Sequence, residues 1–478
     1  MALLTGKEYI ESLKAFSPEV YIRGERAERV WDHPLLRQTV NHLAAGYDAA
    51  SAPETRADYS VRSPLIDEDV SRIGHHIQTS FEDVTIKARL TREVSGRRVC
   101  AGCMSNMLSV TWAMIHDVDQ ARGTDYFPRY QAFIKTLQRN GYGIAWGMMD
   151  PKGDRTLPPS KQSGSADLRI VERRPDGIVV RGTKLHTTYA PGAHQIVAVP
   201  CRALGEADRD FAVSFALPID APGVKLIARP SPGPVHAGAM ESPLSSKYLG
   251  VECLTVFDDV FVPEERVFMC GEWDQCYKLP LYFACLHRQS KCACSAGHTD
   301  LLIGTAALLA EVNGLDAKTS HIREKITDMM MAASTAYGCA LGAAVEGTTH
   351  PSGVFLPDAV VANSGLSYIR SKLAEHLAHI HDVAGGLLVT MPTEADWNNP
   401  ELRPYIESAL AAGGKYSTED RLRVMHLAQD LAASRLTGTL LGFTINAAGS
   451  PVTNRIVVRN LYDLEGRVRI AREIAGLA

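Results

Sequence analysis

The feature that most constrains the fold is a change of hydrophobic periodicity at two points along the chain. Residues 1–141 have helical spacing, residues 142–275 carry short runs rich in Val, Ile and Phe, and residues 276–478 return to long helical patterns. A β-rich zone between two helical zones predicts an α+β protein. We expect an N-terminal helical domain, a middle β domain and a C-terminal helical bundle at these boundaries.

Individual segments carry this expectation. Thr5 followed three residues later by Glu8 predicts a capped helix start, and Asn140-Gly141 predicts a helix end. Helices are expected at 105–116, 130–137, 301–312, 322–344, 367–384 and 418–441. Asp176-Gly177 between two apolar runs predicts a hairpin. Further strands are expected at 195–200, 211–217 and 254–262, with a Pro/Gly-rich loop at 230–243.

Composition excludes several classes of protein. Hydrophobic residues make up 45% and charged residues 22% of the 478 residues, which is a globular composition and not a disordered one. A formal net charge of -4 gives no broad attraction to nucleic acid or to an anionic membrane. The N-terminus lacks the long apolar stretch of a secretory signal, and no run of 18 apolar residues is present. We therefore expect a cytoplasmic protein with neither partner.

The cysteines are grouped unevenly. Cys100 and Cys103 form a C-x2-C pair, and Cys294 follows His287 by seven residues. On a helix seven residues are close to two turns, so His287 and Cys294 share a face, whereas Cys292 lies about 140° away from His287. Three thiolates and one imidazole suit structural zinc or a [4Fe–4S] cluster, and C-x2-C alone also suits a redox disulfide. The alternative is that these side chains only pack in the core.

Four other segments are candidates for a ligand site, each with a simpler explanation. The loop 149–155 offers backbone groups to a planar polar ligand, or is only a solvated loop. Hydroxyls near the end of the run 181–188 suit a flavin edge. Gly385-Gly386 allows close backbone approach, or caps a helix. Glu252, before a predicted strand, is a general base if it is buried and an ordinary surface acid otherwise.

Taken in order, the motifs resemble one family over nearly the whole chain. The chain resembles the 4-hydroxybutyryl-CoA dehydratases, within the 4-hydroxyphenylacetate 3-hydroxylase superfamily. The resemblance rests on K-E-Y-I-E-S-L, D-H-P-L-L-R, D-P-K-G-D-R, I-V-E-x-R-x-D-G-I-V-V-R-G, F-D-D-V-F-V-P, H-R-Q-S, A-G-G-L-L-V-T-M-P and A-G-S-P.

The resemblance implies a fold, cofactors and site residues. It implies an acyl-CoA dehydrogenase-like fold, FAD, a [4Fe–4S] cluster held by three Cys and one His, and a homotetramer. It assigns Cys100, Cys103, His287 and Cys294 to the cluster, and Glu252 to the active site together with His287 and Lys291. For the flavin it points to Met149, Asp150, Lys152, Arg155, His186, Thr187, Thr188, Gly385 and Gly386.

The family reaction removes water from a hydroxyacyl-CoA such as 4-hydroxybutyryl-CoA by a radical (ketyl) route, with vinylacetyl-CoA isomerase activity beside it. Three departures leave the substrate open. The first cysteine pair is Cys-x2-Cys where the family has Cys-x3-Cys, Lys291 stands where a Tyr is expected, and the stretch 442–447 lacks a second Glu. The alternatives are a flavin-dependent aromatic hydroxylase without a cluster and a structural-zinc protein without activity.

Overall fold

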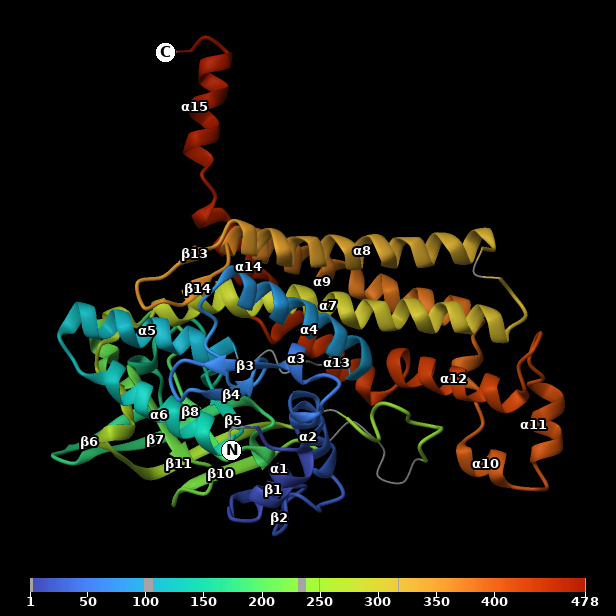
Figure 1. Ribbon diagram of the computed structural model, residues 1–478, viewed down its shortest axis with the longest axis horizontal. Helices are drawn as coiled ribbons and strands as arrows, with labels where there is room; N and C mark the ends of the chain where they lie inside the picture. Colours follow the sequence, from blue (N-terminus) through green and yellow to red (C-terminus); the bar gives the residue numbers. More distant parts are fainter. Residues whose placement is uncertain are drawn as a thin grey trace.

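The computed structural model describes residues 3–98, 106–164, 166–230, 238–248, 250–316 and 318–477. Within these ranges the α+β class is confirmed: helices come first, strands dominate the middle of the chain, and helices return (Figure 1). The early helices are α1 Gly6–Leu13, α2 Arg37–Ser51, α3 Arg56–Tyr59, α4 Phe81–Arg98, α5 Asn106–Arg122 and α6 Tyr126–Asn140. Thr5 and Glu8 form the expected capping box, and Gly141 ends α6 in a left-handed conformation.

Two sheets form the middle of the described chain. The larger has the strand order β2-β1-β10-β11-β7-β6 and the smaller the order β12-β9-β8-β5. The larger sheet contains β1 Glu19–Ile22, β2 Glu25–Ala27, β6 Arg169–Arg174, β7 Gly177–Thr188, β10 Val224–Ala228 and β11 Glu252–Pro263. The smaller sheet contains β5 Ile144–Gly147, β8 Gln195–Ala198, β9 Val213–Pro218 and β12 Val267–Cys270. The hairpin at Asp176-Gly177 is confirmed, because β6 and β7 pair antiparallel on either side of it.

The first zone is less purely helical than its sequence predicts. β1 and β2 join the larger sheet, with β1 running parallel to β10 and Val20 opposite Leu226. β3 Ser60–Ser63 and β4 Glu68–Ser71 form a separate pair. These strands are three or four residues long, too short for an alternating pattern to stand out from the surrounding helices.

The C-terminal zone is built around one long helix. α7 Lys278–Val312 lies beside α8 Ser320–Val345 and α9 Ala359–Val383, and α4 and α5 also pack on it (Figure 1). Its length and apolar composition would suffice for a membrane span, but here most of it is buried by these neighbours. The loop between α8 and α9 carries β13 Thr348–Thr349 and β14 Phe355–Leu356.

The single helix expected at 418–441 is two helices. α12 Thr418–Ala432 ends before Ser434, whose hydroxyl accepts a hydrogen bond from the Leu436 amide and caps α13 Arg435–Asn446. The other C-terminal helices are α10 Glu394–Asn398, α11 Arg403–Ala409, α14 Pro451–Leu461 and α15 Leu464–Ile474. Figure 1 shows α15 projecting from the body of the molecule.

Candidate functional site

The middle of α7 brings together the residues of the H-R-Q-S segment. His287 and Cys294 both lie within this helix, so their seven-residue separation places them on one face, and both are buried. The His287 ring stacks on Phe283 with centroids 4.4 Å apart, which fixes its plane. The Lys291 ammonium lies 3.5 Å from the Cys294 sulfur. The face therefore carries imidazole, ammonium and thiol groups in sequence along one line.

The neighbouring cysteine points elsewhere. The Cys292 thiol donates to the carbonyl oxygen of Ala362 on α9, at 3.2 Å, and burial raises its pKa. Cys292 therefore belongs to the packing between α7 and α9. The expected difference between Cys292 and Cys294 on the helical wheel is present in the structure.

Cys100 and Cys103 lie outside the described residues, but the chain on both sides of them contacts α7. In the second half of α4, the Arg92 carbonyl oxygen would lie only 2.0 Å from a Cβ added at Gly297, so the backbones of α4 and α7 nearly touch there. At the start of α5, the Asn106 amide donates to the Leu286 carbonyl at 3.5 Å. These two contacts lie on either side of the stretch from His287 to Cys294.

One turn beyond Cys294, the same helix buries a further polar group. His298 is buried, and within the described part of the chain its Nε2 atom has no hydrogen-bond partner. Burial, and then the positive charge of Lys291, lower the His298 pKa to about 4, so the ring is neutral at pH 7. The donor types along this face, two imidazoles and a thiol, are those that bind iron or zinc.

Glu252 is the first residue of β11, and its environment differs from that of a surface acid. It pairs with Thr188 of β7 across the sheet, and its Oε2 atom is buried without a hydrogen-bond partner among the described residues. Burial raises the Glu252 pKa to about 7, although the Thr188 hydroxyl and the charge of Arg229 act in the opposite direction. A carboxyl group with this pKa exchanges a proton readily at neutral pH.

The loop expected to contact a flavin is anchored by Asp150. Its carboxylate forms an ion pair with the buried Lys184 ammonium at 2.5 Å and accepts a hydrogen bond from the Cys201 thiol at 2.9 Å. The Met149 carbonyl accepts from the Leu185 amide, which joins the loop to β7. Lys152 and Arg155 remain exposed. The Asp150 side chain therefore holds the loop in place, and the exposed part offers backbone groups and two cations.

The end of β7 separates its two threonines. Thr187 is fully buried and its hydroxyl accepts a hydrogen bond from Thr255 at 2.8 Å, so this hydroxyl faces the protein interior. Thr188 is half-buried, beside Glu252. His186 is exposed and has a φ of 54°, a left-handed conformation uncommon outside glycine. Of these three residues, His186 and Thr188 present polar side chains at the surface.

Gly385 and Gly386 lie in another part of the molecule. Both have positive φ, at 66° and 79°, and an added Cβ would meet nothing within 4 Å at either position. They follow α9 and precede the short helix η7 Leu387–Val389, which packs on α12. In Figure 1, α10 and α12 lie at the opposite end of the molecule from β6 and β7. The predicted flavin-binding residues at 149–155 and 186–188 therefore lie far from Gly385-Gly386 within one chain.

The sequence did not single out a buried polar network beside His287. Arg288 donates to Asn363 at 2.5 Å and to the Ala448 carbonyl at 3.0 Å, and Arg370 donates to the Gly449 carbonyl at 3.0 Å. Burial lowers the pKa of both arginines to about 10. The network joins the H-R-Q-S motif to the A-G-S-P motif. The sequence shows both motifs but gives no sign that they are in contact.

Comparison with known proteins identifies the family. The 4-hydroxyphenylacetate 3-hydroxylase N-terminal model matches residues 5–269, and the C-terminal model of the same family matches residues 276–476. The chain belongs to the 4-hydroxyphenylacetate 3-hydroxylase family. The resemblance expected from the sequence motifs is confirmed.

Within the 4-hydroxyphenylacetate 3-hydroxylase family, dehydratases and monooxygenases are both similar to this chain. The 4-hydroxybutyryl-CoA dehydratase/vinylacetyl-CoA-Delta-isomerase of Clostridium aminobutyricum is 33% identical over 99% of this chain and 100% of the relative. The structure of an oxygen-tolerant 4-hydroxybutyryl-CoA dehydratase from N. maritimus has a TM-score of 0.94, with 32% identity over 100% of this chain and 95% of that one. The 4-hydroxyphenylacetate 3-monooxygenase oxygenase component of Thermus thermophilus is 28% identical over 96% and 95%.

Proposed function

We propose that this protein is a flavin- and [4Fe–4S]-dependent hydro-lyase that acts on a hydroxyacyl-CoA such as 4-hydroxybutyryl-CoA, with vinylacetyl-CoA isomerase activity. A relative named for both activities is similar over its full length, and a solved 4-hydroxybutyryl-CoA dehydratase is similar over 95% of its length. The observation that carries the proposal is the shared face of His287 and Cys294, with the segment that contains Cys100 and Cys103 joining points on either side of it. That arrangement suits a ligand set of three cysteines and one histidine.

The second cofactor of the proposal is FAD. Its binding residues would be the anchored loop at 149–155, His186 and Thr188 at the end of β7, the backbone near Thr187, and Gly385-Gly386. FAD supplies one-electron chemistry to the substrate, and the cluster supplies a Lewis acid for the departing hydroxyl group.

The protein's own residues would handle protons and charge. Glu252, with a pKa of about 7, is the proposed base for a substrate proton, and it shares proton transfer with His287. Lys291 supplies positive charge next to a developing oxyanion or a substrate carboxylate. The buried Arg288 and Asn363 contacts hold His287's part of α7 against the A-G-S-P loop, which positions the imidazole.

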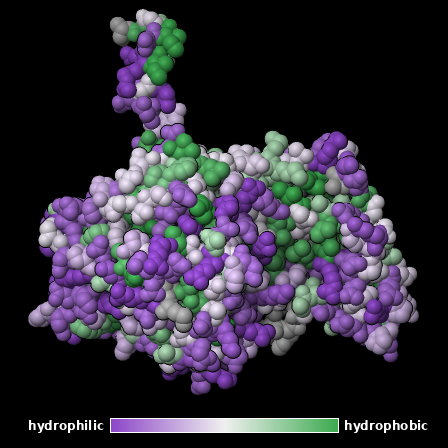
Figure 2. Space-filling view, viewed as in Figure 1, coloured by the Kyte–Doolittle hydropathy of each residue, from purple (hydrophilic) through white to green (hydrophobic). Residues whose placement is uncertain are grey.

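We further propose a homotetramer. Flavin residues at the two ends of one chain meet most simply if a second copy supplies one set. The projecting α15 exposes Leu464, Val468, Ile470 and Ile474, and Figure 2 shows hydrophobic residues along it. An isolated amphipathic helix gains stability by burying such a face, and another copy of the chain is the proposed partner. A cytoplasmic location without nucleic-acid or membrane partners completes the proposal.

A second candidate function is a flavin-dependent aromatic hydroxylase without a cluster. Lys291 in place of the expected Tyr, and the absence of a Glu in 442–447, are the observations that favour it. A 28% identical monooxygenase component is similar over nearly the whole chain. Iron content separates the two candidates.

The deciding experiment is anaerobic purification with iron, sulfide and flavin quantified per chain. The dehydratase proposal expects about four irons, four sulfides and one FAD per chain. Cys294→Ala should lose the iron, whereas the matched control Cys292→Ala should keep it, because Cys292 faces α9. Flavin without iron would refute the dehydratase proposal and support the hydroxylase function instead. Equal iron in both variants would refute the role of Cys294.

A further inference from the structure

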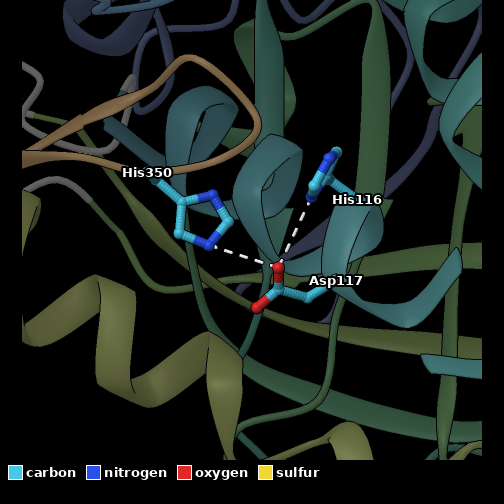
Figure 3. A group of neighbouring side chains, drawn as sticks. All are labelled: His116, Asp117 and His350. Carbon is cyan, nitrogen blue, oxygen red and sulfur yellow. Dashed lines mark hydrogen bonds and ion pairs between the residues drawn. The ribbon is translucent and has the colours of Figure 1, made fainter. Parts of the chain in front are cut away.

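A second group of metal-binding side chains lies near the start of α7, outside the proposed active site. His116 and Asp117 come from the second half of α5, and His350 comes from the turn between β13 and β14. Figure 3 shows both imidazole rings directed at the same oxygen of the Asp117 carboxylate. The three side chains converge from segments more than 200 residues apart in sequence.

The two separations between the imidazoles and the carboxylate match those between ligands of a tetrahedral zinc ion. His116 Nδ1 lies 3.4 Å and His350 Nε2 lies 3.2 Å from Asp117 Oδ1, and all three ligand atoms fall within 4.8 Å of one another. Zinc bonds of about 2.0–2.1 Å place two tetrahedral ligands roughly 3.3 Å apart. Little movement of the rings would therefore accommodate an ion between the three atoms.

The atoms that would not bind the ion are already held. The other Asp117 oxygen, Oδ2, accepts hydrogen bonds from Lys278 at 2.8 Å and Tyr282 at 2.5 Å, which leaves Oδ1 directed at the imidazoles. The other ring nitrogen of His350, Nδ1, lies 2.9 Å from the Ser352 hydroxyl. Metal-binding carboxylates and imidazoles usually have such outer partners, which orient the ligand atoms. The proposed ligand atom of His350, Nε2, lies 3.1 Å from the Tyr282 hydroxyl, a contact that a bound ion would replace.

The three side chains of the group are largely buried but still reach solvent. The side chains of His116, Asp117 and His350 are 17%, 14% and 9% exposed, which leaves a route for an ion from solvent.

We propose that His116, Asp117 and His350 bind a divalent transition-metal ion of the Zn²⁺ type, with water in the fourth position. Two imidazoles favour such an ion over Mg²⁺ or Ca²⁺, which prefer oxygen ligands. The ion would tie α5 to the β13–β14 turn and, through Asp117, to the start of α7. This site contains no sulfur ligand, which distinguishes it from the proposed cluster.

The test is a titration of the purified holoenzyme with Co²⁺, which reports its ligands by its spectrum, followed by competition with Zn²⁺. We expect one equivalent to bind with weak visible bands and without the intense near-ultraviolet charge-transfer band of cobalt–thiolate bonds. Zn²⁺ should displace it and raise the unfolding temperature. His350→Gln should weaken binding at least about a hundredfold, because it removes one of three protein ligands.

The matched control is His379→Gln. His379 belongs to a second, more exposed group with Asp328 and Glu375, and its loss should leave the Co²⁺ affinity unchanged if the proposed site is right. If His350→Gln does not fold, His116→Gln gives the same test from a different element. Absence of Co²⁺ binding, a thiolate band, or unchanged affinity in the folded His350→Gln or His116→Gln variant would overturn the proposal and leave a hydrogen-bonded cluster.

Discussion

Asp150 and Glu252 are two buried carboxyl groups in the β-rich region, and their pKa values are shifted in opposite directions. Asp150 contacts the Lys184 ammonium, and although burial opposes it, this charge keeps the Asp150 pKa below its usual value. Glu252 has one oxygen without a partner among the described residues, and burial raises its pKa to about 7. Burial alone therefore does not mark a functional acid. A carboxylate in an ion pair holds structure together, whereas a buried carboxyl group with an unsatisfied oxygen is available for proton transfer.

The largest expected effect comes from Glu252→Gln. If Glu252 is the base, kcat for dehydration should fall by about 10²–10⁴-fold, because the amide cannot accept the proton. The matched control is Asp259→Asn on the same strand, since Asp259 is an exposed acid paired with Arg181 and its positive φ suits Asn. Turnover of 4-hydroxybutyryl-CoA measures both variants. Equal activity in the two variants would remove Glu252 from the mechanism.

The next effect concerns stability and Asp150. Asp150→Asn leaves the Lys184 ammonium buried without its counter-charge, so we expect a loss of about 3–5 kcal/mol in the free energy of unfolding. Denaturant unfolding measures this loss. The double variant Asp150→Asn with Lys184→Met should recover part of it, because the unpaired charge is then gone. No recovery would show that the pair matters through packing and not through charge.

The smallest effect is a pH dependence of opposite sign for the two acids. Between pH 4.5 and 7, folded Glu252 keeps a proton that the unfolded chain has released, so this group lowers stability as pH rises, by up to about 3 kcal/mol. Asp150 instead stabilises the fold above its unfolded pKa of 3.8, and that contribution disappears as pH falls through its lowered folded pKa. Glu252→Gln should therefore gain stability relative to the wild type between pH 4.5 and pH 8. A constant difference over that range would contradict the raised pKa.

The sequence predicted the parts of the fold that depend on local patterns. The capping box at Thr5, the hairpin at Asp176-Gly177 and the end at Val312 of the helix expected at 301–312 are all encoded within a few residues. β1 was missed because it is stabilised by pairing with β10, about 200 residues away, and β2 was missed because it in turn pairs with β1. The break between α12 and α13 was missed because the helical spacing continues through Ser434.

The site residues also divide into those predicted from local spacing and those that depend on long-range folding. Helical geometry alone placed His287 and Cys294 on one face, and the structure agrees. The interior position of the Thr187 hydroxyl depends on which side of β7 faces Thr255 in the next strand, and so on register. The His116, Asp117 and His350 group has no spacing signal, because long-range folding alone brings His350 to α5.

Gly297 binds nothing itself, but it determines how closely two helices approach each other beside the proposed cluster site. Its missing side chain lets the α4 backbone approach α7 so closely that a Cβ would lie 2.0 Å from the Arg92 carbonyl oxygen. α4 ends at Arg98, six residues after Arg92, and the segment with Cys100 and Cys103 follows it in the sequence. The crossing of the two helices therefore sets the distance between the α4 and α7 backbones beside the proposed ligands His287 and Cys294, and a methyl group at Gly297 would widen that distance. Cluster content in a Gly297→Ala variant would thus report the spacing of two helices and not the loss of any donor atom.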